Sequence, residues 1–527
     1  MLTRKKIIFT TFFTAIAVRV LFAVSFANSF FASYHLVPGL DMETLLRFSQ
    51  WQPGGEIPPF FTFHRLWLFL VWLINGKTHC VWATFILQTL LGAAGIAALT
   101  DSVLKLSRCR KAALVTGIAA GIYLPLMVYE FSILQETFMV NFALIFFWAS
   151  LNILHQRFSL SAGIIFAVSA FAALAGRPAA VIFAAVMLIC CAYHAHKRKM
   201  LKKFIPSVAL LFFLLGGAAF FNYLSFGAPT PFYMVLDYTV EYNTSVTPGA
   251  EKSSELDGLL LSAKNAFTRL PKLIKTGELP ENQNIYFWCE KIPSFHFLLS
   301  PALLIPCAAA GIMIILLTGR WKTRYGLLLI PILTMALPLC AREVIGRYRL
   351  MLVLYFFMAA ACGAVIYWRL KAPKQRALAL CGAGFGALFA IWHGDVPEKI
   401  RLADCGAYAI AAARTPGAAP EKVINEHLLY WEMSRFRSPV AFNMLMDQLL
   451  RFRKTAELRA VAVQALNSSA IDPDEVYYFA AWSYALENQP QKVWENLVKI
   501  KKLSPEKQQN AIMLLNDTKK MLNNMQK

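Results

Sequence analysis

The sequence predicts an all-α protein whose first three quarters cross a membrane many times and whose last quarter forms a separate helical domain. Only 16% of the 527 residues are charged and 57% are hydrophobic, whereas soluble domains are charged at roughly a quarter of their positions. Apolar runs of about 20 residues, the length that crosses a bilayer core, recur up to residue 393. After Asp395 the composition becomes mixed and is typical of paired amphipathic helices.

We predict about eleven spans within a membrane module of residues 1–393, followed by a second domain of residues 394–527. The spans are 7–28, 80–103, 111–129, 137–154, 159–176, 178–194, 204–221, 297–317, 323–340, 350–368 and 377–393. The first apolar run exceeds the ~7–15 residues of a secretory signal, and further spans follow it. We therefore expect a retained anchor.

The loops between the spans predict the orientation. The chain opens with RKK, and the later connections carry KLSRCRK, HQR, HAHKRKMLKK, GRWKTR and RLKAPKQR. A cytoplasmic N-terminus puts all of these basic clusters in the cytoplasm, as the positive-inside rule requires. We expect a multi-pass protein of the inner (cytoplasmic) membrane, with loops 29–79 and 222–296 and the C-terminus extracytoplasmic. These cytoplasmic clusters account for much of the net charge of +22, so the charge does not indicate a nucleic-acid partner.

Residues 60–75, FFTFHRLWLFLVWLIN, are apolar enough for a further span. Counting them as a crossing would place every later basic cluster outside. We therefore expect this segment to be a helix that lies in or dips into the outer leaflet.

The C-terminal domain shows a helical repeat. Pro473 and Pro505 follow helix-turn-helix patterns near the ~34-residue tetratricopeptide period, and Ala481 and Ala485 allow paired helices to approach closely. We predict an extracytoplasmic, tetratricopeptide-like domain. Such stacks usually bind peptides or partners.

Acidic residues occur in two consecutive outward turns. Asp41 could cap a short helix with Glu43 complementing its dipole, or it could accept a proton or hold a cation. Ser132 and Gln135 fit a capping box, with Glu136 in the acidic first turn of the span that follows. Ionisable groups near lipid are costly and tend to mark function. If both acids are functional, neighbouring helices would bring Asp41 and Glu136 to one cavity.

Arginines also lie on the outer side, against the positive-inside trend. Arg347 and Arg349 stand just before a span, and Glu343 could neutralise Arg347 one turn away. Forked guanidinium groups at a helix N-terminus also suit a phosphate, which at this depth would be a lipid headgroup. Arg177, next to Pro178, either snorkels or contributes to the same site.

The order of these motifs resembles that of the GT-C superfamily of integral-membrane glycosyltransferases. The motifs are D-x-E, PPFFTFHRLWL, LQTLLGAAGIAAL, YEFSILQETF, AGRP, ELPENQNIYFW and GRYRLML, between residues 5 and 395. The most similar branch contains protein O-mannosyltransferase-like proteins and the bacterial lipid A aminoarabinose transferase. The resemblance implies transfer of a sugar from a polyprenyl-phosphate donor to an acceptor on the extracytoplasmic face.

The resemblance also implies roles for particular residues. The catalytic base falls on Asp41, with Glu43 left open as the alternative, and a second acid falls on Glu136. The implied donor-phosphate residues are Arg347, Tyr348, Arg349 and Arg177. The implied substrate-binding residues are His64, Glu278 and Asn282. Met351 departs from the family, which often has proline at that position.

No cofactor is certain, although a divalent metal could bind at Asp41 and Glu136. The expected partners are the lipid bilayer, a polyprenyl-phosphate sugar and an acceptor that is a protein, a glycan or a lipid. Three alternatives stay open: a transporter or flippase of a lipid-linked sugar, a ligase or polymerase of lipid-linked glycans, and a membrane-anchored scaffold. We see no matching Gly/Pro-broken spans in two halves, which disfavours the transporter.

Overall fold

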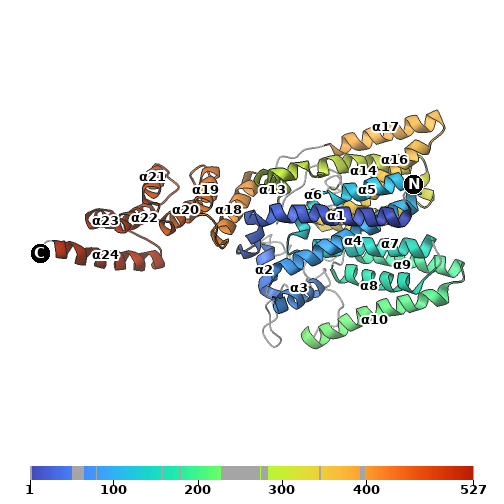
Figure 1. Ribbon diagram of the computed structural model, residues 1–527, viewed down its shortest axis with the longest axis horizontal. Coiled ribbons are helices and arrows are strands. Elements are labelled where there is room, and N and C mark those ends of the chain that lie inside the picture. The colour runs from blue at the N-terminus through green and yellow to red at the C-terminus, as the bar shows by residue number, and fades with distance from the viewer. Residues whose placement is uncertain are drawn as a thin grey trace, which may run out of the picture. The chain divides into compact units, whose positions relative to one another are not determined.

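The computed structural model describes residues 3–49, 65–78, 80–155, 158–176, 180–226, 273, 283–342, 346–391 and 398–525. Every regular element within these ranges is a helix, which confirms the predicted all-α class (Figure 1). The chain divides into two compact units. The first unit is Met1–Phe26 with Gly39–Val396, and the second is Ala27–Pro38 with Pro397–Lys527.

Six helices of the described part are long and apolar enough to cross a membrane. They are α1 (Arg4–Ala27), α4 (Val81–Ser107), α7 (Glu136–His155), α9 (Ala180–Lys197), α10 (Leu201–Phe226) and α16 (Gly346–Arg369). Large apolar side chains on α10 stay exposed, among them Phe212, Phe213 and Phe220. Such a surface suits lipid and would be a liability in water. The helices agree with the predicted membrane protein, whereas the count of eleven spans stays a prediction.

The remaining predicted spans are not among these six helices, and one of them is broken. Three have 17 residues each, namely α8 (Leu160–Gly176), α14 (Pro301–Leu317) and α15 (Gly326–Arg342), and α17 (Pro373–Ala390) has 18. The predicted helix 111–129 is wrong as a continuous element, because it forms α5 (Arg110–Gly121) and α6 (Leu124–Glu130). Pro125 explains the break: in a continuous helix its ring would clash with the carbonyl of Gly121. The freed backbone pairs with Leu299 instead, whose N–H donates to the Ile122 carbonyl at 2.9 Å.

Contacts at the helix ends establish the direction of the bundle. Arg4, at the start of α1, pairs with Asp101 near the end of α4 at 2.7 Å. Trp148, near the end of α7, donates to the same carboxylate at 2.7 Å. Arg369, which ends α16, donates to the carbonyl of Ser107 at 2.8 Å. Helices α4, α7 and α16 therefore end where α1 begins, and their first turns lie at the opposite end of the unit.

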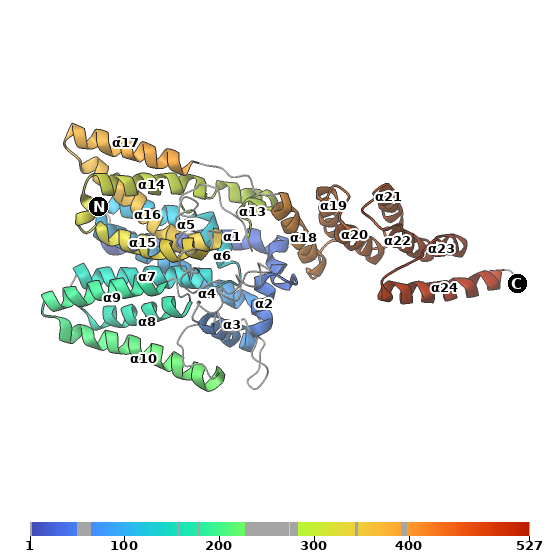
Figure 2. The ribbon, with the colours of Figure 1, turned by 180° about the vertical axis from the view of Figure 1, so that it is seen from behind.

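Short helices gather at that opposite end. Figures 1 and 2 show the N-terminus at one end of the first unit and α2 (Asp41–Ser49), α3 (Arg65–Thr78) and α13 (Ile285–Lys291) at the other. Two 3₁₀ turns, η3 (Pro293–Phe297) and η4 (Arg320–Lys322), flank α14. Helix α3 covers most of the predicted segment 60–75 and has 14 residues, fewer than the ~20 needed to cross a bilayer. Its place in the outer leaflet stays a prediction.

Glycines let α14 and α16 touch through their backbones. A Cβ added at Gly363 would lie 2.4 Å from the Cα of Gly311, and one added at Gly311 would lie 2.2 Å from the carbonyl oxygen of Ala359. No side chain fits at either position without separating the helices. Since α16 also carries the predicted phosphate-facing arginines, this contact holds the helix that presents them.

We expect Gly363→Ala to lower the free energy of unfolding by about 1–3 kcal/mol, because the new methyl group overpacks a backbone contact. Thermal unfolding of the purified protein in detergent measures the change. Gly384→Ala in α17 is the matched control, since a Cβ there meets nothing within 4 Å. Alanine is also the better helix former by about 1 kcal/mol, so the control is expected to be neutral or stabilising. Equal effects of the two substitutions would contradict the packing interpretation.

The second unit is a row of helices, each packed on the next. The helices are α18 (Glu398–Arg414), α19 (Pro420–Met433), α20 (Pro439–Arg451), α21 (Thr455–Leu466), α22 (Pro473–Leu486), α23 (Pro490–Leu497) and α24 (Pro505–Met525). Trp431, Phe442 and Phe479 lie in its core. Lys507 contacts Glu475 and Asn443, which precede it by 32 and 64 positions, as expected of a repeat. Tetratricopeptide identity stays a prediction.

Part of the predicted loop 29–79 belongs to this second unit. Turn η1 (Phe30–Leu36) packs on α18 through Phe31, whose ring centroid lies 4.8 Å from that of Tyr408. Thr415 donates to the Ser33 hydroxyl at 2.8 Å, and Arg414 donates to the Leu36 carbonyl at 2.5 Å. Residues directly after α1 thus stabilise a helix nearly 400 positions later.

Candidate functional site

The first turns of α2, α7 and α16 contain the predicted acids and arginines that the structure describes. Asp41 is the first residue of α2 and Glu136 is the first residue of α7. Arg347, Tyr348 and Arg349 belong to the first turn of α16. Because α7 and α16 run in the same direction, Glu136 and Arg349 lie at the same end of the first unit.

Helix α2 is tied to that end by a short chain of contacts. The side-chain amide of Gln283 donates to the sulfur of Met42 at 3.4 Å, and its oxygen accepts from Trp288 at 2.9 Å. The Trp288 ring stacks on Phe26, at the end of α1, with centroids 5.7 Å apart. Met42 follows Asp41 directly, so these contacts hold the start of α2 beside the end of α1.

A second connection runs from α2 through α3 to α7. Helix α2 packs on α3. Trp67 of α3 is buried, and its ring lies 5.8 Å from that of Phe138. Phe138 lies two positions after Glu136. Helix α3 therefore contacts both α2, which begins at Asp41, and the start of α7. The structure thus brings Asp41 and Glu136 to one region.

Glu43 has an ordinary surface role. Its carboxylate lies 3.9 Å from the guanidinium of Arg47, one turn along α2. An acid in the first turn that pairs four residues on is the usual helix-stabilising arrangement. The pair gives Glu43 a helix-stabilising role on α2.

The predicted capping box before α7 is wrong. In such a box the Ser132 hydroxyl would accept a hydrogen bond from a backbone N–H of the next helix. Instead it donates to the carbonyl of Val128 at 2.8 Å, because α6 ends at Glu130 and Ser132 is still within one turn of it. Gln88 fastens the turn by donating to the carbonyls of Ser132 and Leu134 at 3.0 and 3.1 Å.

Glu136 and Arg349 are both deeply buried for charged residues. Only 2% of each is exposed. Their helices pack against each other, with the rings of Phe147 and Tyr355 5.6 Å apart. A buried guanidinium in the first turn opposes the helix dipole, so its position is not explained by helix stability. The arrangement places an acid and a guanidinium at one end of neighbouring helices.

Four of the predicted site residues lie outside the described residues: Arg177, His64, Glu278 and Asn282. Within the described ranges, no group of three or more His, Cys, Asp or Glu side chains could hold a metal ion. A divalent ion shared by Asp41 and Glu136 therefore stays a prediction.

Sequence reasoning missed a buried ion pair next to the site. Arg19 of α1 forms a bidentate pair with Glu130 at the end of α6, with Nη2 of Arg19 2.6 Å from Oε1 of Glu130. Nη1 of Arg19 donates to the carbonyls of Ala15 and Gly121 at 3.1 and 3.2 Å. Gly92 makes room for the carboxylate, since a Cβ there would lie 2.1 Å from Glu130 Oε1. The sequence signal for this ion pair is Arg19 itself, a single arginine inside the first apolar run.

The Arg19–Glu130 pair adjoins a cluster of aromatic rings. Phe22, one turn after Arg19, has its centroid 5.0 Å from Phe131 and 4.3 Å from Phe295. Phe131 follows Glu130 and also contacts Phe26. The ion pair and the rings together join α1 and α6 to the turn that leads into Glu136.

Comparison with protein-family models, curated proteins and solved structures found no match to this chain.

Proposed function

We propose that this protein is a membrane glycosyltransferase of the GT-C type, which transfers a sugar from a polyprenyl-phosphate donor to an acceptor on the extracytoplasmic face. Glu136 and Arg349 give the strongest support, because two helices bring a buried acid and a buried guanidinium to one end of the first unit. The start of α2, with Asp41, is fastened to the same end.

The reaction follows from the chemistry of these groups. Asp41 accepts the proton of the acceptor nucleophile as its oxygen or nitrogen attacks the anomeric carbon. The bond from that carbon to the phosphate oxygen breaks, and its electron pair stays on the departing polyprenyl phosphate. Direct displacement inverts the anomeric centre. Glu136 binds the sugar or orients Asp41.

Arg349, helped by Arg347 and Arg177, stabilises the leaving phosphate. A guanidinium suits this role because it presents a rigid fork of donors and remains charged when buried. Donors fixed before the reaction stabilise the charge that develops on the phosphate without reorganising. The lipid tail of the donor would lie along the apolar helices in the bilayer.

Reconstitution into liposomes tests the function directly. Liposomes would contain one member of a panel of polyprenyl-phosphate sugars, and the assay would measure free polyprenyl phosphate together with glycosylated acceptor. Acceptors would include a protein, a glycan and a lipid A-type lipid. Product from at least one pair is expected. Translocation of the donor across the bilayer without product would favour the flippase alternative.

Replacement of Arg349 is expected to slow transfer by about 10²–10³-fold, the usual cost of losing one pre-organised donor at a developing charge. Arg349→Gln would be compared with Arg349→Lys, which keeps the charge and recovers part of the rate. Arg47→Gln is the control, because it removes an exposed guanidinium from the same end. Similar rates for Arg349→Gln and the control would contradict the proposed role.

A further inference from the structure

The end of the first unit where α1 begins gathers basic side chains from several elements. The charges of Arg324, Lys105, His194 and Arg108 act on the imidazole of His155, the last residue of α7. Lys105 and Arg108 come from the end of α4, His194 from the last turn of α9, and Arg324 from the connection before α15. We call these five side chains the basic cluster.

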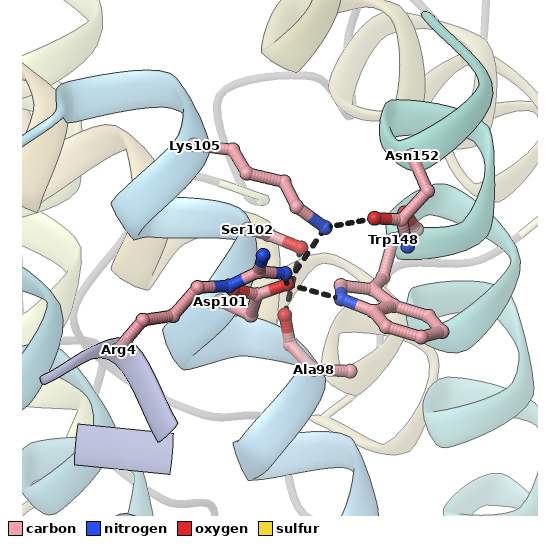
Figure 3. A network of polar contacts seen from close by, with 7 residues as sticks. All are labelled: Arg4, Ala98, Asp101, Ser102, Lys105, Trp148 and Asn152. Carbon is pink, nitrogen blue, oxygen red and sulfur yellow. Dashed lines mark hydrogen bonds and ion pairs between the residues drawn. The ribbon is translucent and has the colours of Figure 1, made fainter. Parts of the chain in front are cut away.

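Both oxygens of the nearby Asp101 carboxylate already have hydrogen-bond or ion-pair partners. Asp101 accepts from Arg4 at 2.7 and 2.8 Å and from Trp148 at 2.7 Å, and it pairs with Lys105 at 2.7 Å (Figure 3). Lys105 also donates to the side-chain oxygen of Asn152 at 2.5 Å. Within the described ranges no ion pair joins Arg108 or Arg324 to a carboxylate. The basic cluster therefore carries positive charge that the described residues do not neutralise.

Two ring nitrogens of the basic cluster are also unsatisfied. His155 Nδ1 and His194 Nε2 are buried, and neither has a hydrogen-bond partner among the residues that the structure describes. Buried polar atoms are nearly always paired with protein, water or a ligand. An anion with several oxygens would supply both the missing acceptors and the missing charge.

We propose that the basic cluster binds a phosphate group, carried either by an anionic lipid headgroup or by a soluble phosphate compound. Arg108 is exposed, while Arg324, His155 and His194 are half-buried, so the groups can be reached from the helix ends. Phosphate oxygens match the forked donors of arginine, and basic recesses between membrane helices bind lipid headgroups. The site lies at the opposite end of the unit from Glu136 and Arg349, and it does not depend on the proposed function.

The test uses the full-length protein in detergent micelles. Binding of fluorescent phosphatidylglycerol would be compared with that of phosphatidylcholine, and inorganic phosphate would be added as a competitor. The double variant Arg108→Gln/Arg324→Gln is expected to weaken phosphatidylglycerol binding by on the order of fivefold for each guanidinium removed. Arg320→Gln is the matched control, because it removes an exposed charge from the same connection outside the basic cluster.

Two outcomes support the proposal and identify the source of the phosphate. Phosphatidylglycerol binding that is lost in the double variant and resists millimolar phosphate indicates a lipid headgroup. Binding of inorganic phosphate with the same dependence on Arg108 and Arg324 indicates a soluble ligand. Equal weakening by Arg320→Gln, or no weakening by the double variant, overturns the proposal. Arg108→Lys/Arg324→Lys keeps both charges and should bind, and thermal unfolding would verify that every variant is folded.

Discussion

Asp41→Asn is expected to reduce sugar transfer at least about 100-fold, the lower end of what general-base catalysis contributes. Asparagine has nearly the same shape as aspartate but cannot accept the proton of the acceptor nucleophile. The liposome assay would measure initial rates at saturating donor and acceptor. Because Asp41 is only partly buried and opens a short helix, the variant should fold normally, and its thermal unfolding should match that of the parent protein.

Glu43→Gln provides the matched control on the same helix. It removes a carboxylate two positions away and with it the surface pair with Arg47. A surface pair contributes less than about 1 kcal/mol, so this variant should keep both its fold and most of its activity. If Glu43→Gln is inactive while Asp41→Asn retains near-normal activity, the base is Glu43. If both are active, the proton acceptor is neither residue.

Removing one partner of the Arg19–Glu130 pair is the second large effect that we expect. Arg19→Met leaves the Glu130 carboxylate buried without a counter-charge, which should cost about 3–5 kcal/mol of unfolding free energy. Arg19 and Glu130 are each only 1% exposed, so water cannot replace the lost partner. Thermal and denaturant unfolding in detergent would measure the loss.

The double variant Arg19→Met/Glu130→Met separates the charge effect from packing. It removes both charges while keeping side chains of similar length, and replacing a whole buried pair by apolar residues is often neutral. Its stability should recover to near that of the parent protein. Arg47→Met, which breaks the surface pair on α2, should cost less than about 1 kcal/mol. A double variant as unstable as Arg19→Met would contradict the electrostatic interpretation.

Local patterns in the sequence were sufficient for the helices and for the membrane-protein class. Long apolar runs become helices in a membrane because only there can every backbone group be paired within the segment. Runs such as Arg4–Ala27 and Val81–Ser107 are therefore found where they were predicted. Pro473 and Pro505, which were predicted to follow helix-turn-helix pairs, begin the next helices, α22 and α24.

Predictions that depended on where one helix ends and the next begins, or on partners far away in the chain, were less successful. The capping box at Ser132 was wrong because α6 ends close enough for the hydroxyl to reach the Val128 carbonyl. The helix 111–129 is broken at Pro125, and the freed backbone pairs with Leu299, about 175 positions later. The Arg19–Glu130 pair went unnoticed because its partners are 111 positions apart.

The amino-acid sequence by itself determined which segments are helical and apolar, which ends are basic, and which acids and arginines stand in first turns. These properties follow from neighbours within one or two turns of the chain. Only the tertiary structure decided that Glu136 and Arg349 share one end of packed helices, and that charged side chains from the end of α4, the last turn of α9 and the connection before α15 act on His155. Those outcomes depend on helix direction and on close backbone contacts such as that between Gly311 and Gly363, which no local pattern encodes.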